Sequence, residues 1–108
     1  MESAMYTARG LVAQNEIADK VAAVADQFRP EVVRVRYSLG ANVAGEPSIF
    51  FRILLTDKAA KKRNLLQFVK QVEAALDEAI DFYEYGLSLY FSYRSESEQA
   101  DLKEEIWN

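Results

Sequence analysis

One stretch that repeats every two residues decides how this chain folds: Glu31-Val-Val-Arg-Val-Arg-Tyr-Ser-Leu39. Successive side chains of a β-strand point to opposite faces, so the alternation predicts a strand with one apolar face. The face expected to point toward the core carries Val33, Val35, Tyr37 and Leu39. The opposite face carries Val32, Arg34, Arg36 and Ser38. The strand is therefore expected to turn two arginines away from the core.

A second strand is predicted over Ser48 to Thr56, after a loop rich in turn-forming residues at Gly40 to Pro47. Most of its residues are apolar, so Arg52 decides which face points outward. If Arg52 faces solvent, Phe50 and Leu54 share its face. The inward side chains are then Ile49, Phe51, Ile53 and Leu55. Because the two strands are close in sequence, we expect them to form a hairpin.

Two apolar stripes predict helices. The first, Ile17, Val21, Val24 and Phe28, predicts a helix over residues 15–28, which begins at Asn15 and is ended by Pro30. The second predicts a long helix from about Lys58 to Tyr83, with Asp57 as its cap. Its expected buried residues are Leu65, Phe68, Val69, Val72, Leu76 and Ile80.

Alternation returns near the end of the chain. It predicts a third strand over Leu87 to Arg94, with Tyr90 and Arg94 among the outward residues. Residues 95–108, which we call the tail, are acidic and can begin a short helix at Ser95 or Ser97. The expected fold is an α+β two-layer sandwich, in which two helices cover one face of a three-stranded sheet. Its element order is helix, strand, strand, helix, strand and tail, and the position of the third strand is left open.

Length and composition limit the function. A chain of 108 residues is expected to form a single domain over 1–108, with 1–14 partly flexible. The absence of histidine and cysteine removes the commonest catalytic bases, nucleophiles and zinc ligands. We therefore expect no enzyme, no cofactor and no metal site. No signal peptide or apolar span is recognisable, so the prediction is a cytoplasmic protein without membrane contact.

The outward residues of the three strands form a candidate interaction face. Its members are Arg34, Arg36, Phe50, Arg52, Leu54, Tyr90 and Arg94, with Trp107 of the tail. The net charge is −4, but residues 28–70 carry +6 and residues 71–108 carry −8. The tail could therefore cover the arginines, either in its own chain or from a second subunit. A wet sheet face and a bound nucleic acid are the alternatives.

A second candidate site is the basic group Lys58, Lys61, Lys62 and Arg63. It is predicted in the first turns of the long helix, where free N–H groups favour anions. Phosphate or RNA contact and a simply hydrated helix end are both open. Glu73, Asp77 and Asp81, four residues apart on the same helix, are expected to form a hydrated row.

Two resemblances follow from these elements. The order over residues 15–94 resembles type II KH domains and ribosome-binding factor A, which implies association with RNA or the ribosome. The Gly-x-x-Gly loop of KH domains is absent, and Lys61-Lys62-Arg63 lies in the nearest comparable region. Three segments are similar to a set of short uncharacterised bacterial proteins: Val32-Val-Arg-Val-Arg-Tyr-Ser-Leu-Gly40, Gly45-Glu-Pro-Ser-Ile-Phe-Phe-Arg52 and Tyr93-Arg-Ser-Glu-Ser-Glu-Gln-Ala100. That likeness implies a partner-binding role.

The sequence thus predicts a small non-catalytic interaction module. It would self-associate as a homodimer, or bind a protein partner, through the outer face of its sheet. The alternative is an RNA-binding module that uses the basic group and the sheet arginines.

Overall fold

The computed structural model describes residues 13–108, and these form an α+β fold. The first part of the predicted flexible segment, residues 1–12, lies outside the described residues. Helix α3 spans Gln14–Gln27 and buries Ile17, Val21 and Val24, as the apolar stripe predicts. Its N-cap is Ala13 rather than Asn15, so the helix begins slightly earlier than expected.

The sheet contains β1 (Val32–Ala41), β2 (Pro47–Leu55) and β3 (Ser88–Ser95), in the order β1-β2-β3. Strands β1 and β2 form the expected antiparallel hairpin, and β3 runs parallel to β2. The third strand therefore lies beside the second, which the sequence left open. Placing β2 in the centre explains its apolar composition, because both of its edges are paired and most of its side chains are buried.

A β-bulge corrects the predicted faces of β1 at its first residues. Val32 pairs with Leu55 and Arg34 pairs with Leu54, so Val33 is the extra residue between them. Val32 is consequently in the core at 1% exposure, whereas Val33 is only half-buried. The prediction had these two valines reversed, because strict alternation cannot register an inserted residue.

The single long helix predicted from Lys58 to Tyr83 is wrong. The segment forms three helices: α4 (Asp57–Ala60), α5 (Leu65–Ala79) and α6 (Phe82–Tyr85). Thr56 caps α4 by accepting a hydrogen bond from the Ala59 N–H, the role predicted for Asp57. Residues 61–64 are all charged or polar, so they supply no apolar side chain to hold a continuous helix against the core. Gly86 ends α6 in the left-handed conformation at φ 69°.

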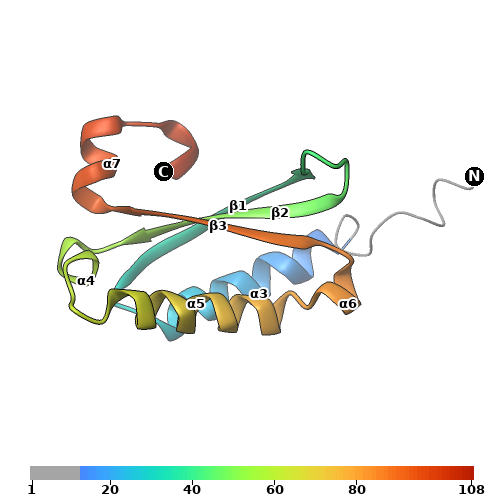
Figure 1. Ribbon diagram of the computed structural model, residues 1–108, viewed down its shortest axis with the longest axis horizontal. Coiled ribbons are helices and arrows are strands. Elements are labelled where there is room, and N and C mark those ends of the chain that lie inside the picture. Colours follow the sequence, from blue (N-terminus) through green and yellow to red (C-terminus); the bar gives the residue numbers. More distant parts are fainter. Residues whose placement is uncertain (1–12) are drawn as a thin grey trace, which may run out of the picture.

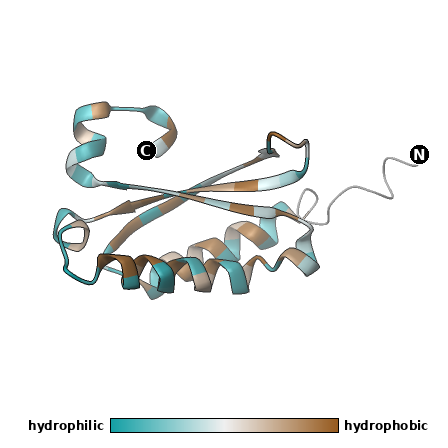
Figure 2. Cartoon of the chain, viewed as in Figure 1, coloured by the Kyte–Doolittle hydropathy of each residue, from teal (hydrophilic) through white to brown (hydrophobic). Residues whose placement is uncertain are grey.

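The layers meet as predicted (Figure 1). Helices α3 and α5 cover one face of the sheet, which we call the inner face, and the tail lies over the outer face. The core joins α3, α5 and the inward side chains of the strands, among them Phe51, Ile53 and Leu76. Figure 2 shows hydrophobic colour where the helices face the sheet and mostly hydrophilic colour on tail helix α7. No helix in the described part of the chain has the length and apolar character required to cross a membrane.

Candidate protein-interaction surface

Four arginines lie side by side on the outer face. Arg36 of β1 pairs directly with Arg52 of β2, and Leu54 lies between Arg34 of β1 and Arg94 of β3. The pairing thus gathers residues that are far apart in the sequence. We call Arg34, Arg36, Arg52 and Arg94 the arginine face.

The tail of the same chain covers the arginine face. It consists of helix α7 (Glu96–Leu102) and a short 3-10 helix, η1 (Glu105–Trp107). Helix α7 begins at Ser95, one of the two predicted starts, with a capping box between Ser95 and Glu98. Figure 1 shows this segment folded back above the sheet. Of the two kinds of cover that the sequence allowed, the structure therefore shows cover by the tail of the same chain.

Three of the arginines hold the end of the tail by its main chain. The Nε of Arg52 donates to the carbonyl oxygen of Ile106 at 2.9 Å, and that of Arg34 to Trp107 at 3.1 Å. The Nε of Arg36 donates to the oxygen of Asn108 at 2.7 Å. Main-chain oxygens of three consecutive residues thus receive charged donors, which make stronger hydrogen bonds than neutral ones.

Arg94 makes the contacts to side chains. Its guanidinium donates to the Gln99 amide oxygen at 2.9 Å and pairs with the Glu104 carboxylate. It also lies over the Trp107 ring, 4.6 Å from the ring centroid, a cation–π geometry. Trp107 is 7% exposed and Gln99 is 6% exposed, so both are buried by this arrangement. Leu54, an outer-face residue, is likewise only 4% exposed.

The arginines contact other groups of the tail than its net charge suggested. Main-chain oxygens, rather than the row of tail carboxylates, receive three of the four arginines. Two other apolar tail residues, Leu102 and Ile106, are each 55% exposed and so do not pack on the sheet. In η1 the Ile106 and Trp107 carbonyls accept from the sheet arginines, and of its side chains Trp107 is the one buried. Burial also lowers the pKa of Arg52, with a smaller effect from the neighbouring Arg36.

A second anchor attaches the tail to α4, and sequence reasoning missed it. The Asp57 carboxylate accepts from the Ser97 N–H at 2.9 Å and also from the Ser97 hydroxyl. These hydrogen bonds hold the pKa of Asp57 below its ordinary value. The acid and the serine are 40 residues apart, and no local pattern connects them.

The tail leaves the other half of the outer face uncovered. There the rings of Phe50 and Tyr90 stack at 5.2 Å between centroids. Tyr90 is 43% exposed, and its hydroxyl accepts from the Asn42 side chain at 3.0 Å. Val43, in the adjoining hairpin loop, is fully exposed. We call Asn42, Val43, Phe50 and Tyr90 the open half of the outer face.

The basic group does not lie in the first turns of a long helix. Lys58 is in the short helix α4, while Lys61, Lys62 and Arg63 are in the turn before α5. The ammonium of Lys62 is 3.1 Å from the carboxylate of Glu31. A hydrogen bond from the acid's own main chain, and then this contact, lower the pKa of Glu31. The basic group therefore lies between α4 and α5 rather than in the first turns of one long helix, and its contact with an anion or RNA stays a prediction.

Comparison of this chain with protein-family models, curated proteins and solved structures gives no significant match. The resemblances to KH domains and to short bacterial proteins therefore stay predictions.

Proposed function

We propose that the chain is a small, non-catalytic protein-interaction module that self-associates through the open half of its outer sheet face. The observation that carries this proposal is the stacked Phe50–Tyr90 pair, left uncovered beside the exposed Val43. Aromatic side chains and arginines are enriched at protein interfaces. A cluster of exposed apolar groups on an otherwise polar face favours a protein contact. The absence of cysteine fits a reducing compartment, so the proposal places the module in the cytoplasm.

Charge at the two ends of the open half favours a second copy of the chain as the occupant. Arg36 lies toward the tail, and Glu46 lies at the hairpin loop, with Phe50 between them along the ladder. Both charged residues are exposed. A twofold axis through the aromatic pair would bring Arg36 of each copy toward Glu46 of the other. Such a surface is self-complementary, as an isologous dimer requires.

The RNA-binding alternative has less support from the described residues. The Nε groups of Arg34 and Arg52 already bind the tail, and the ammonium of Lys62 pairs with Glu31. An RNA would have to compete with those contacts. RNA binding is therefore measured alongside self-association.

The experiment is sedimentation velocity over a range of protein concentrations up to about 1 mM, since a small interface predicts weak association. The wild-type chain should form a dimer as concentration rises, and Tyr90→Ser should remain monomeric. Tyr83→Ser is the matched control, because Tyr83 is 92% exposed on α6, away from the outer face. That variant should dimerise as the wild type does.

A wild-type chain that stays monomeric at 1 mM would contradict the proposal, as would a dimer that Tyr90→Ser leaves intact. A parallel measurement uses a fluorescent single-stranded RNA of mixed sequence. Tight binding by the wild-type chain, lost at high salt, would favour the RNA-binding module instead. The proposal expects no saturable RNA binding at physiological salt.

A further inference from the structure

The free edge of β3 is the least protected strand edge in the described sheet. Strand β3 is an edge strand, so alternate residues turn their N–H and C=O groups away from β2. Its eight residues include neither proline nor lysine, and its pairing with β2 has no break in register. The opposite edge strand, β1, carries a bulge, a common protection of sheet edges. Residues 88–93 of β3 are therefore able to accept another strand.

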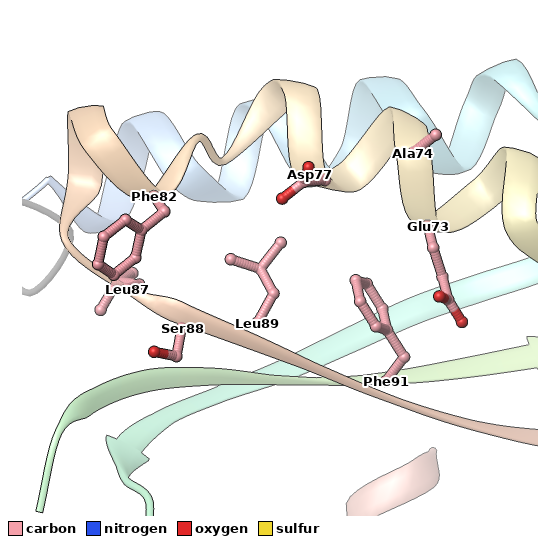
Figure 3. Close-up of a pocket in the computed structure, with 8 residues that line it drawn as sticks. All are labelled: Glu73, Ala74, Asp77, Phe82, Leu87, Ser88, Leu89 and Phe91. Carbon is pink, nitrogen blue, oxygen red and sulfur yellow. The ribbon is translucent and has the colours of Figure 1, made fainter.

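An apolar cleft lies beside this edge, between β3 and helices α5 and α6 (Figure 3). Its volume is about 460 Å³. Figure 3 shows Leu89 and Phe91 reaching from β3 toward α5, with Phe82 of α6 at one end of the cleft. Phe82 is 49% exposed, while Leu89 and Phe91 are half-buried. A strand added to β3 would thus find apolar surface for side chains on the helix side.

Two carboxylates on α5 complete the cleft. Glu73 and Asp77 line it from above in Figure 3. The Tyr93 hydroxyl donates to Glu73 at 2.7 Å, which positions that carboxylate beside β3. Four residues of helix rise about 6 Å. Alternate residues of a strand are about 6.6 Å apart, so two side chains on one face of an added strand match the two acids.

We propose that β3 binds an extended peptide segment of a protein partner by strand addition. Contacts between the peptide side chains and this cleft determine which peptide binds. The segment carries a basic residue at two alternate positions, facing Glu73 and Asp77. A third helix-side position, next to Phe82, is apolar. Main-chain hydrogen bonds to β3 supply affinity, and the cleft supplies specificity.

The charges of Glu73 and Asp77 make a second copy of this chain an unfavourable partner at this edge. In a symmetric β3–β3 dimer, α5 of each copy would face α5 of the other. Glu73 and Asp77 would then meet their own equivalents, and like charges at an interface are unfavourable. The two proposals use different sides of β3: the open half uses the Tyr90 side chain on the outer face, whereas strand addition uses the main-chain edge and the helix side. Tyr90→Ser tests the first, and the charge variants of Glu73 and Asp77 test the second.

The experiment is an NMR titration that follows backbone amide chemical shifts. Isotopically labelled protein, at constant concentration, receives the acetylated and amidated peptide Thr-Leu-Thr-Lys-Thr-Lys-Thr. The reversed order, Thr-Lys-Thr-Lys-Thr-Leu-Thr, is included because an added strand can run in either direction. One of the two should produce saturable shifts in the backbone amides of residues 88–93. The same peptides with Glu in place of Lys should bind at least about fivefold more weakly, as expected for two partly exposed ion pairs.

Matched variants separate the charge effect from a change in fold. Glu73→Gln with Asp77→Asn keeps the shape of both side chains and should weaken the Lys peptide about fivefold. Asp101→Asn with Glu105→Gln makes the same charge change on the exposed tail and should leave affinity within about twofold. Equal affinity for the Lys and Glu peptides would overturn the proposal. Chemical-shift changes confined to other strands would do the same, as would no binding at millimolar peptide. So would changes at β3 that follow protein concentration and not peptide concentration.

Discussion

Arg94→Ala tests whether the arginine face holds the tail. The substitution removes the hydrogen bond to Gln99, the ion pair with Glu104 and the contact over Trp107. The Gln99 bond is worth about 1 kcal/mol, because its amide is buried. The cation–π contact adds about 1 kcal/mol, since the Arg94 side chain is 18% exposed. Glu104 is 53% exposed, so its ion pair adds only about 0.5 kcal/mol.

The expected loss is therefore about 2.5 kcal/mol in the free energy of tail docking. Trp107 is the only tryptophan, so its fluorescence reports the tail directly. In the variant its emission should shift to longer wavelength as the ring becomes hydrated. Undocking of the tail exposes less surface than unfolding of the whole chain, so its slope is below about 1.5 kcal/mol per molar urea and the fluorescence transition should move down by at least about 1.7 M. The circular dichroism of the main core should change at higher urea than the fluorescence.

Arg63→Ala is the matched control, because Arg63 is exposed in the turn before α5. It should change stability by no more than about 0.5 kcal/mol. If Arg94→Ala also stays within that range and leaves the emission maximum unchanged, the reasoning about the tail is refuted.

Three other substitutions test the surroundings of the tail and the cleft. Ser95→Ala removes the capping box of α7 and should cost about 1 kcal/mol of tail docking, measured by Trp107 fluorescence. Asp57→Asn tests the second anchor. Hydrogen bonds from Ser97 lower the pKa of Asp57 below 3.8. The ionised acid therefore stabilises the fold above pH 3.8, and this effect is lost as pH falls through the lowered pKa. The difference in urea midpoint between Asp57→Asn and wild type should shrink from about pH 5 to about pH 2, and a constant difference would argue against the anchor. Burial, and then the hydrogen bond to Glu73, raise the pKa of Tyr93 above 10.0, so its stabilising effect is present below that pH and lost above it. In an absorbance titration near pH 10, Tyr93→Phe should overlay the folded wild type, whereas an extra ionising group in the wild type would contradict the raised pKa.

The strands and α3 could be predicted because each buries a regular stripe. Periods of two and of 3.6 residues are visible in one sequence whenever a single face packs against a core. The start of α7 was predicted at Ser95 or Ser97, and the structure selects Ser95 through its capping box with Glu98. The bulge at Val33 and the break before α5 have no such periodic signal. The bulge depends on how β1 pairs with β2, and the break on residues 61–64, which interrupt the apolar stripe without ending the run of helix-compatible residues.

The arginine face shows the same division. Alternation along three strands was enough to place Arg34, Arg36, Arg52 and Arg94 on the outer face, and the acidic tail was recognised as a candidate cover. Only the tertiary structure decided how the cover is made, because peptide oxygens and the ring of Trp107 are offered by a particular backbone path. The same holds for the Asp57–Ser97 anchor and for the cleft beside β3. Local periodicity determines which face a side chain takes, whereas the contacts between distant segments depend on the three-dimensional path of the whole chain.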